Sequence, residues 1–162
     1  MDELYQQTKS VFSSTPHHNK IFSRPIAFNV IPQIDQFTEN DFSAEEIKIA
    51  KEVQKLISPR LKIAATSVRV PVMVGHSISL AIEFNQPIQL DEIKALLATS
   101  PGLRLSADQF STPLEVEGQD EVYVGRIRRD PSVEQGLLLW TVSDNLRRGA
   151  ALDTVEIAER IF

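Results

Sequence analysis

The stretch RVPVMVGHSISLAIEF, Arg69–Phe84, holds the clearest fold signal in the chain. Its second half alternates between apolar residues and polar or small ones, and the apolar positions are Ile78, Leu80, Ile82 and Phe84. A period of two predicts a strand over Ser77–Phe84 with one buried face. The first half ends a longer apolar run, Leu61–Val74, which we expect to form another strand.

Two side chains of this stretch can carry chemistry. Arg69 can hold a carboxylate through two parallel hydrogen bonds, and His76 can exchange a proton near neutral pH. Residues seven apart point to opposite faces of a straight strand. The chain must therefore bend, at Pro71 and Gly75, if both side chains are to meet one ligand. Taken singly, a surface arginine and a solvated loop histidine are the simpler interpretations.

Four segments are predicted to be helical. The best is Ser43–Ile57, which begins with a capping box of Ser43 and Glu46. Its apolar residues recur at helical spacing, at Ile47, Ala50, Val53 and Ile57. The other expected helices are Asp2–Phe12, Asp91–Thr99 and Ala150–Phe162.

Further strands are expected at Glu121–Arg129, at Gly136–Ser143 and, in short form, near Leu103–Leu105. The run Gly136–Ser143 is continuously apolar, so we predict a buried strand with Trp140 in the core. Residues 13–20 and most of 103–118 indicate loops. Residues 21–34 contain two prolines and favour extended, strand-like segments over a helix. The irregular order of elements predicts one α+β domain over residues 1–162, with a mostly antiparallel sheet and helices packed on one face.

Composition excludes several function classes. The net charge is −5 with acids and bases interspersed, so no basic stripe for nucleic acid is present. No apolar run approaches the roughly 20 residues of a membrane span, and the first residues do not resemble a signal peptide, so we expect a cytoplasmic location. The chain has no cysteine, which excludes disulfides and thiol chemistry within it. It also lacks a glycine-rich dinucleotide loop. We interpret His17 and His18 as solvated loop residues, so no metal site is expected.

Three other groups of polar residues have alternative interpretations. Glu45 and Lys48 are either an ion pair on a solvated helix face or ligands for a substrate's ammonium and phosphate groups. The arginines of Asp120–Arg129 favour a subunit interface over an anion site. One of Ser143, Asp144 and Asn145 could cap the final helix, and Asn145 could instead contact a ligand amide.

Five motifs, taken together and in this order, resemble aspartate-semialdehyde dehydrogenase. They are AFNVIPQID (Ala27–Asp35), EEIK (Glu45–Lys48), ATSVRVPVMVGHS (Ala65–Ser77), DEVYVGRIRRD (Asp120–Asp130) and LWTVSDNLRRGAA (Leu139–Ala151). The resemblance covers nearly the whole chain and is to the family's C-terminal substrate-binding and dimerisation domain. It implies a fold like the C-terminal domain of glyceraldehyde-3-phosphate dehydrogenase, and a homodimer.

The resemblance also implies a reaction. Members of this family reduce L-4-aspartyl phosphate to aspartate 4-semialdehyde with NADPH, a step in lysine, threonine and methionine biosynthesis. By motif position, His76 resembles the acid/base residue, and Arg69 and Glu45 resemble residues that bind substrate. Lys48 resembles the phosphate-binding lysine, and Asn145 a residue near the nicotinamide.

The family's nucleophilic cysteine and its cofactor-binding domain have no counterpart in these residues. We therefore expect NADP to be bound mainly by an N-terminal domain, residues 147–162 to pack on that domain, and the chain alone to be inactive. The alternative is a non-catalytic dimerising module or pseudoenzyme of the same family. A reductase of N-acetylglutamyl phosphate fits the motifs less well.

Overall fold

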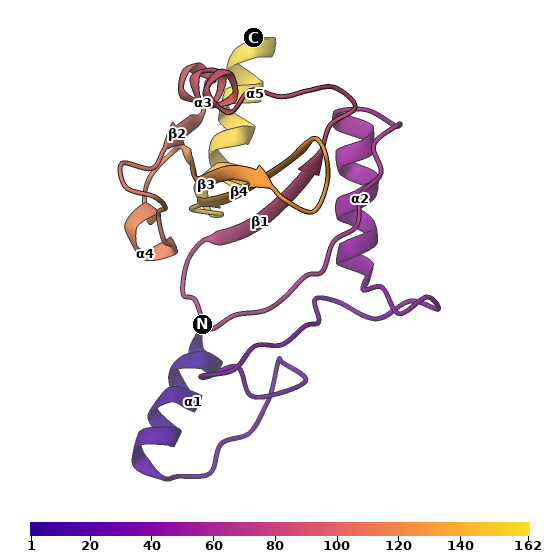
Figure 1. The fold of residues 1–162 in the computed structure, drawn as a ribbon. Helices are drawn as coiled ribbons and strands as arrows, with labels where there is room; N and C mark the ends of the chain where they lie inside the picture. Colours follow the sequence, from indigo (N-terminus) through magenta and orange to yellow (C-terminus); the bar gives the residue numbers. More distant parts are fainter. The chain divides into compact units, whose positions relative to one another are not determined.

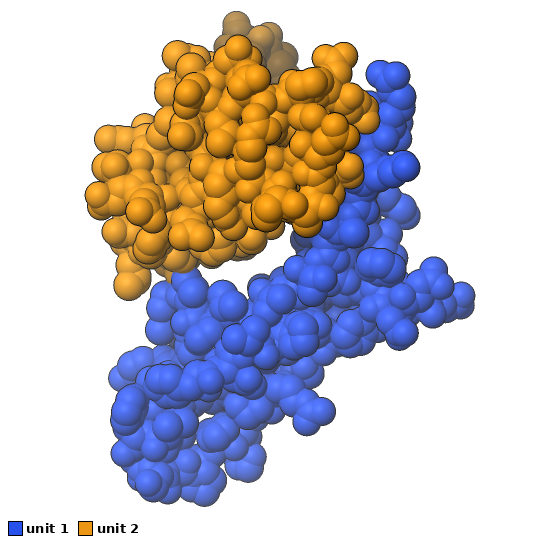
Figure 2. Space-filling model, in the orientation of Figure 1, with its two compact units in different colours: residues 1–73 blue, residues 74–162 orange.

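The computed structural model describes all 162 residues, in two compact units, Met1–Met73 and Val74–Phe162 (Figure 2). In chain order, unit 1 holds α1 and α2, and unit 2 holds a four-stranded sheet with three α-helices and a short helical turn (Figure 1). None of the helices has the length and apolar composition that crossing a membrane requires.

In unit 1, helix α1 (Asp2–Ser13) confirms the predicted N-terminal helix. It is bound to the following loop by the buried side chain of Gln7. The Gln7 Oε1 atom accepts the N–H groups of Ile26 and Ala27, at 2.7 and 3.1 Å, and its amide nitrogen donates to Glu3 and Asn19. Because every polar atom of this amide is paired, its burial is not costly. A small apolar cluster lies beside it, made of Leu4, Ile26 and Ile31.

Helix α2 (Ala44–Leu56) has the predicted capping box. The Ser43 N–H donates to a Glu46 carboxylate oxygen at 2.8 Å, and the Glu46 N–H donates to Ser43 Oγ at 3.4 Å. The predicted apolar stripe is only partly covered, since no residue of the helix is fully buried and Ile57 is exposed.

Two predicted extended regions, residues 21–34 and Leu61–Val74, are not strands. Their only pairing is one isolated antiparallel bridge, in which Ile31 and Arg69 exchange backbone hydrogen bonds of 3.0 and 2.8 Å. Prolines interrupt both regions and cannot donate to a ladder. In addition, the Ser67 N–H is taken by the side chain of Glu46.

In unit 2, the sheet has the order β1-β4-β3-β2. The strands are β1 (His76–Glu83), β2 (Leu103–Leu105), β3 (Val122–Asp130) and β4 (Gly136–Ser143). Strand β4 pairs antiparallel with β1 and β3, whereas β2 pairs parallel with β3. The mostly antiparallel α+β fold is as predicted, and each strand lies within one residue of its expected bounds.

One face of the sheet packs against α3 (Leu90–Thr99) and forms the core. The buried residues of this core are Ile88, Val124, Leu137 and Leu139, and the residues packed against them include Leu80, Ile82, Ile93 and Leu97. Trp140 alternates with Leu139 and lies on the other face, half-buried, where its indole N–H donates to the Ser111 carbonyl at 3.0 Å. The expectation of a core tryptophan was therefore wrong. Leu96 of α3 is 66% exposed and takes no part in this core.

Three local features differ from the sequence expectation. Helix α4 (Pro113–Val116) lies in a predicted loop, where Thr112 and Glu115 form a second capping box. Strand β3 has a bulge between Gly125 and Arg128, which explains why its alternation is imperfect. The final helix α5 (Leu152–Ile161) follows a five-residue turn, η1 (Arg147–Ala151). It starts later than expected because Gly149 has φ +102°.

Candidate functional site

Unit 1 contains three of the five candidate residues, Glu45, Lys48 and Arg69. Glu46 links the two segments that hold them. Glu45 and Lys48 flank Glu46 in the first turns of α2. One Glu46 oxygen closes the capping box, and the other accepts the Ser67 N–H at 2.7 Å, two residues before Arg69. The helix start that holds Glu45 and Lys48 is thus fixed to the segment that holds Arg69.

The Glu46 carboxylate is held in its charged form by these contacts. The Ser67 N–H, followed by the N–H of Ser43, lowers the pKa of Glu46 below its ordinary value. Hydrogen bonds from backbone N–H groups favour a carboxylate over a carboxylic acid. The link therefore persists at neutral pH.

The other side chains of this group are accessible. Arg69 is exposed, while its backbone is held by the bridge to Ile31. Lys48 Nζ and Glu45 Oε2 lie 3.6 Å apart, which is the predicted i,i+3 ion pair on a partly solvated face. An exposed pair of this kind is worth little, so an incoming ligand can displace it.

Unit 2 brings the other two candidates together. His76 is the first residue of β1, is exposed, and pairs in register with Ser143 at the end of β4. The preceding Gly75 has φ +100°, a backbone conformation that glycine adopts readily. The Gly75 N–H donates to Asn145 Oδ1 at 2.9 Å. Asn145 therefore touches the residue next to His76.

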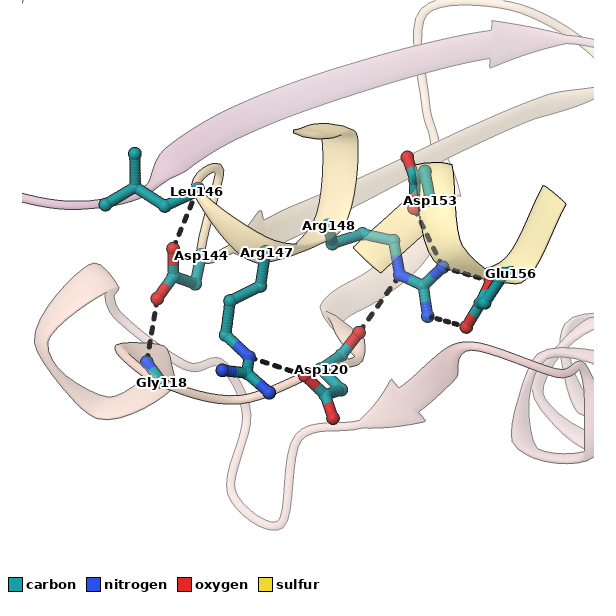
Figure 3. A network of polar contacts seen from close by, with 8 residues as sticks. All are labelled: Gly118, Asp120, Asp144, Leu146, Arg147, Arg148, Asp153 and Glu156. Carbon is teal, nitrogen blue, oxygen red and sulfur yellow. Dashed lines mark hydrogen bonds and ion pairs between the residues drawn. The ribbon is translucent and has the colours of Figure 1, made fainter. Parts of the chain in front are cut away.

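The loop after β4 is fixed by Asp144 (Figure 3). This buried carboxylate accepts the N–H of Gly118 at 2.8 Å and that of Leu146 at 2.9 Å. The Gly118 N–H, helped by Leu146 and by the charge of Arg147, holds the pKa of Asp144 below its ordinary value against the opposing effect of burial. None of the three residues considered as caps, Ser143, Asp144 and Asn145, caps the final helix, because α5 begins at Leu152 and has no side-chain cap. Asp144 instead accepts the Leu146 N–H within the loop before η1.

Two arginines complete this network. The Arg147 guanidinium forms an ion pair with Asp120, and the Arg148 Nε donates to the Asp120 carbonyl at 3.0 Å. Arg148 also forms ion pairs with Asp153 and Glu156, at 2.9 and 2.8 Å. The sequence motif SDNLRRGAA did not reveal these partners, because neither it nor the motif that begins at Asp120 shows which residues meet in space.

An open hollow lies beside the bulge of β3, lined in part by Lys94, Arg126 and Arg128. The Arg126 N–H donates to the Gln109 carbonyl at 2.7 Å, and the Arg128 guanidinium donates to the Arg126 carbonyl at 2.8 Å. No candidate residue lies in it, and the choice between an interface and an anion site for these arginines stays a prediction.

Comparison with known proteins gives a consistent result. Residues 1–148 match the family model described as semialdehyde dehydrogenase, dimerisation domain. The aspartate-semialdehyde dehydrogenase of Rickettsia bellii is 46% identical over the whole chain, and that of Bacillus subtilis is 40% identical over 98% of it.

Solved structures agree with the sequence comparison. The crystal structure of aspartate-semialdehyde dehydrogenase II from Vibrio cholerae, complexed with ASA, superposes with a TM-score of 0.94 at 42% identity over 98% of the chain. The chain spans about half the length of the relatives that it matches, 49% for the Rickettsia bellii protein and 48% for the Vibrio cholerae chain. On this evidence the chain belongs to the aspartate-semialdehyde dehydrogenase family and contains its dimerisation domain.

Proposed function

We propose that this chain is the substrate-binding and dimerisation half of an aspartate-semialdehyde dehydrogenase, which reduces L-4-aspartyl phosphate to aspartate 4-semialdehyde with NADPH. The observation that carries the proposal is the 46% identity over the whole chain, in a sequence that keeps His76, Arg69, Glu45 and Lys48. We infer a homodimer, a cytoplasmic location and a role in lysine, threonine and methionine biosynthesis on the same ground.

In this proposal the cations of unit 1 bind the substrate. The Arg69 guanidinium matches the planar geometry of the substrate's α-carboxylate and can hold it through two hydrogen bonds. Lys48 offers a point charge to the phosphate, and Glu45 offers a carboxylate to the ammonium group. The fixed backbone around Arg69 and the start of α2 supports these roles, since preorganised groups lose less entropy on binding.

His76 is the proposed acid/base residue. It would accept the proton of a thiol nucleophile and later return a proton to the reacting centre, with its imidazole acting near neutral pH. These 162 residues contain no cysteine, so in this proposal the thiol comes from the rest of the full-length protein. The isolated chain is accordingly expected to be inactive.

Asn145 fits the edge of a dinucleotide site. Its Oδ1 is taken by the Gly75 N–H, and its amide nitrogen can donate to a carboxamide oxygen. When bound, the dinucleotide would supply the hydride. The chain itself has no glycine-rich phosphate loop, so we expect most of the NADP contacts to lie outside it. We also propose that η1 and α5 pack against that cofactor domain.

The test is the activity of the full-length protein, as wild type and as His76→Ala. We expect dehydrogenase activity that the substitution lowers by about 10²-fold or more, the usual contribution of a general acid/base. His18→Ala, at an exposed loop histidine, is the matched control and should keep wild-type activity. Absence of activity in a wild-type protein that has the family's cysteine would favour the non-catalytic dimerising module instead.

A further inference from the structure

We propose that Asn145 is a positioning residue for His76, through its hydrogen bond to the Gly75 backbone. This inference rests on the proposed acid/base role of His76. It adds to the proposed contact of Asn145 with a nicotinamide: one end of the amide would hold the turn before His76, and the other would face the cofactor.

The first argument is the register of the sheet. The pairing of β1 with β4 ends at His76 and Ser143, and beyond this pair the chain after β4 turns away into η1. The Gly75 N–H would otherwise lack a strand partner, and Asn145 Oδ1 accepts it at 2.9 Å. The side chain thus extends the ladder by one hydrogen bond, at the residue next to the imidazole.

The second argument is the tight backbone at Gly75. Its φ of +100° is a conformation that residues with a side chain rarely adopt. A Cβ atom built there would lie 3.1 Å from the Ser143 carbonyl oxygen and 3.3 Å from Pro113 Cβ. The backbone at this position therefore packs closely against Ser143 and Pro113, and its N–H is bound by Asn145.

The third argument is that Asn145 belongs to a loop whose other residues are held by hydrogen bonds and ion pairs. Its neighbour Asp144 is buried and bonded to Gly118 and Leu146. The two arginines that follow are held by Asp120 and Glu156 (Figure 3). Because the loop that carries Asn145 is itself held in place, its hydrogen bond can fix the position of Gly75; a mobile loop could not do so.

The test compares two substitutions that remove different ends of the amide. Asn145→Ala removes both, whereas Asn145→Asp keeps an oxygen for the Gly75 N–H and removes the amide donor. In the full-length protein, we expect Asn145→Ala to lower kcat by about tenfold to a hundredfold, the scale of a misplaced catalytic group. Asn145→Asp should recover most of this kcat while raising the KM for the dinucleotide. Equal losses of kcat in both variants would overturn the proposal.

A second readout does not depend on activity. By NMR of the 162-residue chain, we expect Asn145→Ala to speed exchange of the Gly75 amide by about fivefold, the effect of one lost hydrogen bond, and to shift the His76 ring signals. Asn145→Asp should have a smaller effect on the Gly75 exchange rate and on the His76 ring signals. Asn85→Ala, at an exposed residue of the turn after β1, is the matched control.

The two readouts separate the possible failures. Unchanged Gly75 exchange and unchanged His76 signals in Asn145→Ala would overturn the positioning role, whatever the activity of the enzyme. An inactive wild-type enzyme would overturn the proposed function, and shifted His76 signals would then still support the contact of Asn145 with the turn before it.

Discussion

Glu46 accepts the backbone N–H of Ser67 at 2.7 Å, across 21 residues of sequence. The same carboxylate closes the capping box at the start of α2. One side chain thus both begins a helix and fixes the segment that leads to Arg69. Since the three candidate residues of unit 1 lie on these two segments, the link sets the local geometry that a substrate would meet.

Removing either partner of the capping box should loosen this arrangement. We expect Ser43→Ala to lower the free energy of unfolding by about 1 kcal/mol, the usual cost of losing an N-cap side chain. Glu46→Ala should also destabilise the chain and, in addition, speed hydrogen exchange at the Ser67 amide. Glu52→Ala, at an exposed position of α2, is the control. If Ser67 exchanged at the same rate in Glu46→Ala and wild type, the proposed link between the two segments would be wrong.

The charge of Asp144 should make stability depend on pH in a defined window. Its pKa in the folded chain is lowered from 3.8, mainly by the Gly118 N–H. A lowered folded pKa stabilises the fold above the unfolded value, and this contribution is lost as the pH falls through the folded pKa.

Asp144→Asn should therefore be destabilised at pH 7, by about 1–2 kcal/mol for a charged hydrogen-bond acceptor. Its difference from wild type should shrink as the pH falls below 3.8. Urea unfolding at pH 7 and pH 3 measures both values, with Asp108→Asn at an exposed site as the control. A difference that stayed constant over this range would show that the carboxylate charge is not what stabilises the loop.

Strands β1 and β4 of unit 2 were predictable because both have a strong local signal. The alternation of Ser77–Phe84 and the apolar run of Gly136–Ser143 gave strands β1 and β4 almost to the residue. Unit 1 was harder, since the apolar run Leu61–Val74 has strand composition but only one paired residue, Arg69. Composition reports which residues suit a sheet, and it does not report whether a neighbouring strand exists.

The candidate site likewise has a part that the sequence predicted and a part that only the structure revealed. The motifs indicated His76, Arg69 and Asn145, but only the structure showed that Asn145 contacts the turn before His76. The contacts that Gly118 and Asp120 make with the loop after β4 were not predictable, because a backbone N–H and a loop carboxylate produce no periodic pattern in the sequence. Long-range hydrogen bonds of this kind depend on the register of β3 and β4, which is set by the whole sheet.

The proposed role of Arg69 can be tested by a conservative change. In the full-length protein, Arg69→Lys keeps the charge but loses the second hydrogen bond to a carboxylate. We expect the KM for aspartate semialdehyde to rise about tenfold to a hundredfold, the equivalent of one charged hydrogen bond, with a smaller change in kcat. Arg60→Lys, at an exposed arginine of unit 1, should match wild type. A fall in kcat at unchanged KM would argue that Arg69 does not bind the substrate.

The proposed homodimer can be tested on the sheet. Small residues of β1, Ser79 and Ala81, are exposed on the face opposite the core, where they pair with Trp140 and Leu138 of β4. The small side chains of Ser79 and Ala81 leave room for the close approach of a second copy. We therefore propose this face as the dimer surface and expect Ala81→Arg to shift the chain from dimer to monomer, because it places an unpaired charge there.

Light scattering over a range of concentrations measures this shift, with Gln86→Arg at an exposed turn as the control for added charge. A wild-type chain that stays monomeric at high concentration would contradict the homodimer itself. If Ala81→Arg stayed dimeric, as the control should, the interface would lie on another surface. The arginine-lined hollow beside β3 would then be the next surface to test.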